Sequence, residues 1–151
     1  MQTLSLQEAT RLAEQTAAVA EGHIPYASGL GAPASFTLAW LLAGAGLADI
    51  RVASGSSGMG DHFWIETAQW RIDPTLRQFP HLNHRPLVAP VSEPGNFAAD
   101  KYHPVPASRA DAVREVSYGF RNAAETEAFV NEMTTALSRE LALPADRLPT
   151  R

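Results

Sequence analysis

The chain contains no cysteine among its 151 residues. This absence excludes disulfide bonds and thiolate metal sites. It also removes the side chain that acyl-transfer enzymes most readily use as a nucleophile at neutral pH. A chain of this length can bury a hydrophobic core that is stable without such cross-links.

The sequence also lacks an excess of positive charge and any long apolar run. Its 16 Asp and Glu residues outnumber 12 Lys and Arg, for a formal net charge of −4. This balance gives no electrostatic reason to bind nucleic acid or an anionic membrane. No segment approaches the roughly 18 consecutive apolar residues of a membrane span, and the N-terminal residues have no signal-peptide pattern. We therefore expect a cytoplasmic protein whose residues 1–151 form one domain.

Three segments have the apolar spacing of helices. Ser5 can cap a first helix that ends at Gly22. A second helix is expected over Ala34–Ala45, entered through Pro33, and its almost wholly apolar sequence indicates burial on most sides. A third helix is expected over Ala123–Leu141.

The region between the second and third helices is expected to form a small antiparallel sheet. Two alternating runs, His62–Glu66 and Gln69–Asp73, are separated by two residues and read as a hairpin. A two-residue turn there pairs His62 with Asp73, Trp64 with Arg71, and Glu66 with Gln69. Further short strands are expected over Asp49–Gly55 and within the proline-rich residues 80–106.

This hairpin separates apolar from polar side chains. One face carries Phe63, Ile65, Trp70 and Ile72, and the other carries His62, Glu66, Arg71 and Asp73. A histidine held by an aspartate through one ring nitrogen can take a proton from a nucleophile with the other. Because a helix N-terminus favours a thiolate and can bind an oxyanion, the nucleophile is expected within residues 31–35.

The sequence from Gly29 to Thr75 contains "GLGAPASFTLAWLLAGAGL", "DHFWIE" and "WRIDPT" in that order. It resembles the core of the transglutaminase-like branch of the papain-like superfamily, over roughly a third of the chain. The H-x-W and D-P-T half of the pattern is more specific than the helical half. By position, the resemblance implies these roles: His62 as general base, Asp73 as orienting carboxylate, Gly29 before the nucleophile, Gly46 closing the helix, and Trp64 and Thr75 beside the dyad.

The sequence departs from the family pattern at the nucleophile. The resemblance expects cysteine near position 31 or 32, where this chain has Gly31 and Ala32. Alignment on the two flanking glycines favours position 31, whereas alanine is the usual replacement for a disarmed cysteine, which favours Ala32. Ser35 could substitute only if the helix began later than its proline implies. With Trp64, Gly31 and Ser35 are the candidate substrate-binding residues.

Other interpretations of these residues remain open. His62 and Asp73 could form a hydrogen-bonded pair with a purely structural role. His81 and His84 could bind zinc together with one member of the dyad, although the spacing offers no third ligand of its own. The sequence "GLGAPA" also matches a dinucleotide-binding fingerprint with Asp49 as its acidic residue, but no convincing strand precedes it.

The resemblance implies an α+β fold with a papain/transglutaminase-like core, in which a buried helix of the N-terminal half packs on a small antiparallel sheet. It implies acyl transfer through a thioester, as amide hydrolysis, deamidation or amide formation, without a metal or organic cofactor. The expected partners are a peptide, protein or small amide or acyl substrate, including an acyl carrier protein. Either a cysteine enzyme is seen here as an inactive Cys-to-Ala variant, or the chain is a natural pseudoenzyme that binds such a partner.

Overall fold

The computed structural model describes residues 3–23 and 30–148. Within them, helices and antiparallel strands combine in a mixed fold, and the strand order of the sheet is β4-β3-β2-β1-β5. The elements in chain order are α1 Leu6–Glu21, α2 Gly31–Gly44, β1 Arg51–Ser56, β2 Asp61–Glu66, β3 Trp70–Ile72, β4 Val88–Pro90, β5 Lys101–His103, α3 Arg109–Val116 and α4 Ala123–Leu141.

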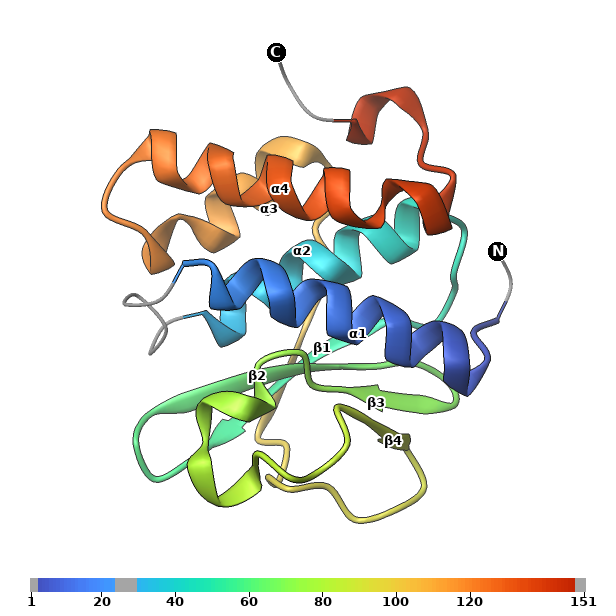
Figure 1. The fold of residues 1–151 in the computed structure, drawn as a ribbon, viewed down its shortest axis with the longest axis vertical. Helices are drawn as coiled ribbons and strands as arrows, with labels where there is room; N and C mark the ends of the chain where they lie inside the picture. Colours follow the sequence, from blue (N-terminus) through green and yellow to red (C-terminus); the bar gives the residue numbers. More distant parts are fainter. Residues whose placement is uncertain (1–2, 24–29, 149–151) are drawn as a thin grey trace.

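The helices cover one side of the sheet, and α2 lies between the strands and the α3 and α4 layer (Figure 1). This position explains its apolar sequence, because side chains on every side of α2 are buried. Trp40, Leu41 and Leu42 are wholly inaccessible to solvent. A helix that is apolar all round belongs inside a protein. None of the helices in the described residues combines the length and hydrophobicity needed to cross a bilayer.

The predicted helix ends are largely confirmed. Ser5 caps α1 in a reciprocal capping box with Glu8, and Gly22 follows its last turn. The predicted bounds of α4 agree with the structure. Gly46 follows α2 with a φ of 96°, a left-handed conformation that glycine adopts without strain. The start of α2 was predicted too late, because the helix begins at Gly31 rather than at residue 34.

The predicted hairpin register is wrong by two residues. The structure pairs Ile65 with Ile72 and Glu66 with Arg71. The cause is the turn, in which the Thr67 hydroxyl accepts hydrogen bonds from the backbone N–H groups of Gln69 (3.3 Å) and of Trp70, the first residue of β3 (2.9 Å). Because side chains alternate with period two, a two-residue shift leaves every side chain on its predicted face.

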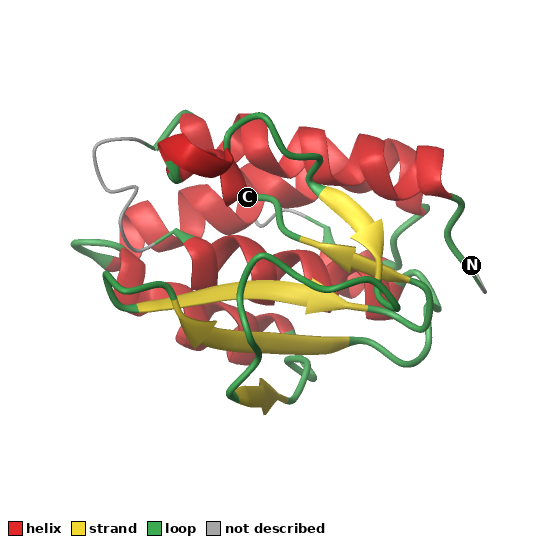
Figure 2. Cartoon of the chain, turned by 90° about the horizontal axis from the view of Figure 1, so that it is seen from below, coloured by secondary structure: helices red, strands yellow, loops and turns green. Residues whose placement is uncertain are grey.

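The polar face of the hairpin is buried as well. The chain between β4 and β5 crosses the side of the sheet that faces away from the helices, as Figure 2 shows. This crossing segment comes so close to β1 that a Cβ atom on Gly55 would lie 2.0 Å from the carbonyl oxygen of Ala98. Only glycine allows this approach. The Asp100 backbone N–H donates to Ser54 O at 2.7 Å and fixes the segment in place.

Candidate active site

The structure brings His62 and Asp73 into direct hydrogen-bond contact. His62 Nε2 lies 2.9 Å from Oδ1 and 2.7 Å from Oδ2 of Asp73. His62 is the second residue of β2, and Asp73 directly follows the short strand β3. In the observed register the two residues are diagonal neighbours on adjacent strands instead of opposite ones. Both are buried, with 2% and 5% of their surfaces exposed. A buried carboxylate that accepts from Nε2 fixes the orientation of the imidazole ring.

The other ring nitrogen of His62 faces the first residue of α2. A Cβ atom on Gly31 would lie 3.2 Å from His62 Nδ1 and 3.6 Å from its Cε1. Ala32 lines the same cavity. Successive helical side chains point about 100° apart around the axis, so a helix that turns position 31 toward Nδ1 turns position 32 aside. The geometry therefore favours Gly31 over Ala32 as the position from which a side chain would reach His62.

The N-terminus of α2 presents backbone donors at this point. Its N-cap residue, Leu30, has no side chain that can accept from the first-turn N–H groups, and no acidic residue occupies the first turn. Pro33 carries no N–H of its own. The backbone of Gly31 and Ala32 borders the cavity, where the positive end of the helix dipole favours a developing negative charge.

A cavity of about 400 Å³ opens beside these groups. Its lining comes from the start of α2, the turn between β1 and β2, and the chain after β3: Gly31, Ala32, Ser57, Met59, Asp61, His62, Phe63, Gln78, Phe79, Pro80 and His81. Most of this surface is apolar, and among its polar residues Gln78 contacts His62 directly. The cavity has the size of a site for a small organic group or an extended side chain.

Gln78 is a site residue that the sequence reasoning missed. Its side-chain nitrogen lies 3.3 Å from His62 Nδ1 and 3.4 Å from Thr75 Oγ1. An amide N–H that donates to Nδ1 makes this nitrogen the acceptor, so the ring proton is on Nε2 and points to Asp73. The only sequence signal is the position of Gln78 in the turn that follows the D-P-T motif.

Trp64 and Ser35 do not line the cavity, although both were candidates for substrate contact. Trp64 is buried beneath the crossing segment, where its Nε1–H donates to Glu66 Oε2 at 3.0 Å. Ser35 is buried one helical turn beyond Gly31, and its hydroxyl has no hydrogen-bond partner among the described residues. Because α2 begins at position 31, the condition under which Ser35 could act as nucleophile is not met.

Aromatic rings enclose the dyad. The His62 ring has Phe79 edge-on at 4.9 Å and Phe97 tilted at 4.9 Å, measured between ring centroids, and stacks with Trp64 at 6.0 Å. Trp64 and Phe97, which do not line the cavity, cover the histidine on other sides, and Phe79 packs against it from the cavity wall. The low local polarity strengthens each hydrogen bond that the dyad makes.

Burial raises the pKa of the Asp73 carboxyl above its ordinary value, and the hydrogen bond from His62 opposes this rise only in part. The folded protein thus binds the Asp73 proton more tightly than the unfolded chain does. The free energy of unfolding consequently falls as pH rises from the unfolded pKa, about 3.9, through the higher folded-state pKa.

Replacing Asp73 with asparagine should remove this titration. The free energy of unfolding of the Asp73→Asn variant, relative to the original protein, is expected to increase with pH over that range. Urea unfolding between about pH 3 and pH 7 measures the difference. Asp61→Asn, which alters an exposed carboxylate on β2, is the matched control and should show no comparable trend. A relative stability of the Asp73 variant that declines with rising pH would contradict the assignment.

The other candidate ligands are separated. His81 and His84 are both exposed, and of the two only His81 is in the lining of the cavity. In the part of the chain that the structure describes, no three His, Cys, Asp or Glu side chains are grouped so that they could hold a metal ion. Asp49 lies beyond the C-terminal end of α2, at the opposite end from a dinucleotide phosphate site. Gly29, the predicted glycine before the nucleophile, falls outside the described residues.

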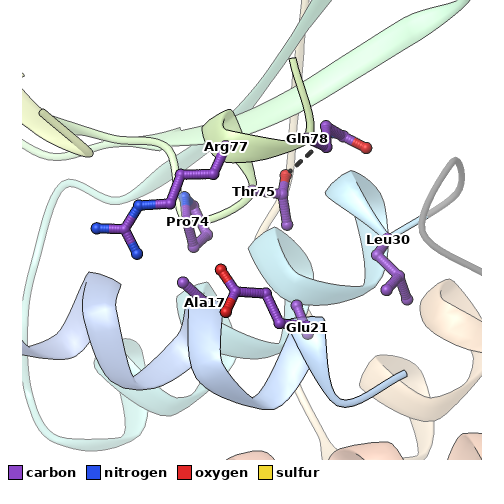
Figure 3. A pocket seen from close by; sticks show the side chains of 8 residues that line it. Ala17, Glu21, Leu30, Pro74, Thr75, Arg77 and Gln78 are labelled. Atoms are coloured by element: carbon purple, nitrogen blue, oxygen red, sulfur yellow. Dashed lines mark hydrogen bonds between the residues drawn. The ribbon is translucent and has the colours of Figure 1, made fainter. Parts of the chain in front are cut away.

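A second cavity, of about 290 Å³, also has Gln78 in its lining (Figure 3). It is bordered by the last turns of α1, by Leu30, and by the chain from Pro74 to Gln78. In Figure 3 the hydrogen bond from Gln78 to Thr75 stands at the edge of this cavity. Gln78 therefore borders both cavities, and its side chain contacts Thr75 of the D-P-T motif.

No protein-family model, curated protein or solved structure is significantly similar to this chain.

Proposed function

We propose that this domain has an acyl-transfer site of the transglutaminase-like, papain-like type, in which position 31 is the nucleophile position. With glycine at that position, the chain binds an acyl or amide substrate without forming a thioester of its own. One observation carries the proposal: the imidazole of His62 is held by Asp73 through Nε2, and its Nδ1 lies 3.2 Å from where a Cβ atom of residue 31 would be.

Each part of the site has a role in this chemistry. His62 is the general base that accepts a proton from the nucleophile and returns it to the leaving group. Asp73 orients the ring and stabilises its charged form. The backbone N–H groups at the start of α2 face the oxygen that becomes negative in the tetrahedral intermediate. Gln78 contacts Nδ1 and can donate its amide N–H to the same oxygen when substrate is bound.

The cavity suits the acyl part of a peptide, of a protein side chain, of a small amide or of a carrier-bound group. Its apolar walls, which include Phe63, Phe79 and Pro80, accept a hydrocarbon chain. The polar groups around His62 would bind the carbonyl. Attack by water gives hydrolysis or deamidation, and attack by an amine gives a new amide, with the same residues acting in either case.

Installing a cysteine tests the proposal. The Gly31→Cys variant should react with iodoacetamide at pH 6 about tenfold faster than the Ala32→Cys variant, which places a thiol on the same helix turn beside the same cavity. The estimate combines two effects: pairing with His62 raises the thiolate fraction by about 100-fold, and the lower thiol pKa reduces its intrinsic nucleophilicity by about tenfold. Mass spectrometry of quenched samples follows the alkylation.

The result depends on His62 if the proposal is correct. Adding His62→Ala to Gly31→Cys should return the alkylation rate to that of Ala32→Cys. If the thiol at 31 reacts no faster than the thiol at 32, or keeps its rate without His62, the acyl-transfer assignment is wrong. Circular dichroism of each variant verifies that the rates compare folded proteins.

A further inference from the structure

The space next to His62 Nδ1 is the first of three features that together define a ligand site. Glycine at position 31 places no side chain of its own against Nδ1, and both Gly31 and His62 border the 400 Å³ cavity. A Cβ atom there would already be 3.2 Å from the nitrogen. A small molecule in the cavity can therefore place an atom in hydrogen-bond contact with Nδ1.

The second feature is a buried proton acceptor directed at that space. His62 is 2% exposed, and Asp73 occupies its Nε2. Its Nδ1 has a long contact of 3.3 Å with the amide of Gln78. A buried polar atom gains more from a good partner than an exposed one does, because water does not compete. An incoming S–H or O–H group could donate its proton to Nδ1 in place of this long contact.

The third feature is that the described cavity walls offer no thiol and no hydroxyl group that is free of a hydrogen bond to the protein. Among the described lining residues, Ser57 is the one with a hydroxyl group. This hydroxyl donates to Gly60 O at 2.8 Å in the turn between β1 and β2. Met59 contributes a thioether, which has no proton to lose. A hydroxyl or thiol that attacks a bound carbonyl next to His62 must therefore come from outside the described walls.

A thiol suits this position better than water or an alcohol. Thiols ionise near pH 8.5, so a neutral imidazole can take their proton at neutral pH, whereas unactivated hydroxyl groups hold theirs far more strongly. The N-terminus of α2 stabilises a thiolate. Phe63, Phe79 and Met59 in the walls favour an organic sulfur compound over water.

We propose that the site takes a small organic thiol as its nucleophile, bound with its sulfur against His62 Nδ1 in the space that Gly31 leaves. The inference rests on the proposed function, since the same dyad acts as the base. The sulfur attacks the carbonyl carbon of an ester or amide, and its proton passes to Nδ1. The bond to the leaving alcohol or amine then breaks, the leaving group takes that proton, and the products are a thioester of the small thiol and the free alcohol or amine.

The experiment uses the unmodified chain with p-nitrophenyl acetate and 2-mercaptoethanol. The release of p-nitrophenol should saturate with thiol concentration and exceed the reaction in buffer by about 10²-fold, the lower end of general-base catalysis. Mass spectrometry should detect S-acetyl 2-mercaptoethanol as the product. Ethylene glycol, in which oxygen replaces the sulfur, should give no acceleration.

Two variants locate the thiol. Gly31→Ala fills the space with a methyl group that has no nucleophilic atom, and it should abolish the acceleration while the fold is kept. His62→Gln should abolish it as well. A second measurement needs no variant: in ¹⁵N-resolved NMR spectra of the imidazole, the Nδ1 resonance of His62 should shift on addition of the thiol and stay unchanged with the glycol.

The outcomes separate this inference from the proposed function. If the chain hydrolyses the ester equally well without thiol, water is the nucleophile and the inference is wrong. Acceleration that survives in Gly31→Ala, or an Nδ1 resonance that the thiol leaves unmoved, overturns it too. Fast, His62-dependent alkylation of Gly31→Cys without any effect of added thiol on the unmodified chain would uphold the proposed function and reject the thiol site alone.

Discussion

In the Gly31→Cys variant, replacing His62 with glutamine should slow acetylation of the new cysteine by p-nitrophenyl acetate by about 10²–10⁴-fold at pH 7. Glutamine can still donate an amide N–H to Asp73, so the buried carboxylate keeps a hydrogen-bond partner. It cannot accept and release a proton at neutral pH. The loss therefore measures the general base, and the rate of p-nitrophenolate release in the burst phase, with the ester in excess, reports it directly.

His81 provides the matched control for this result. It lines the same cavity, six residues after Thr75 of the D-P-T motif, and its ring contacts Phe79 at 6.3 Å between centroids. The Gly31→Cys, His81→Gln variant should be acetylated at a rate within about threefold of that of Gly31→Cys. This loss of rate is smaller than the roughly 10²-fold that the removal of a general base causes at the least. Equal losses for the two histidines would mean that neither acts as a specific base for position 31.

The parts of the fold that follow from local chemistry were predictable from the sequence. Ser5 with Glu8 three residues later is a capping signal, and the structure contains that capping box. Alternation of apolar and polar residues assigned the faces of the hairpin correctly, because period two survives an even shift of register. The apolar sequence of α2 likewise indicated a buried helix before its surroundings were known.

The parts that depend on distant contacts were not predictable. The register follows from the side chain of Thr67, which binds the turn and shifts the pairing by two residues. The crossing segment covers the dyad because Gly55 admits Ala98, an approach between residues 43 positions apart in the sequence numbering. Gln78 reaches His62 through the same kind of tertiary placement. Periodicity carries no information about any of these three contacts.

Replacing Trp40 with alanine should lower the free energy of unfolding by about 3–5 kcal/mol. Trp40 is wholly buried in the middle of α2, between the sheet and the outer helices. Removing its ring leaves a cavity that the surrounding elements can fill only in part, so both transfer energy and packing are lost. Urea unfolding followed by circular dichroism measures the change, and a loss below about 1 kcal/mol would show that the site collapses around the smaller side chain.

Trp40→Phe separates ring packing from hydrogen bonding. The indole Nε1–H is buried with no hydrogen-bond partner in the described part of the chain, and burial of an unpaired donor costs about 1–3 kcal/mol. Phenylalanine removes that donor but keeps most of the ring volume, so the two effects oppose and the variant should lose less than about 1.5 kcal/mol. The same helix, α2, positions Gly31 beside His62, so a loss of packing at Trp40 should loosen the site. The alkylation rate of Gly31→Cys should therefore fall when Trp40→Ala is added and be retained when Trp40→Phe is added.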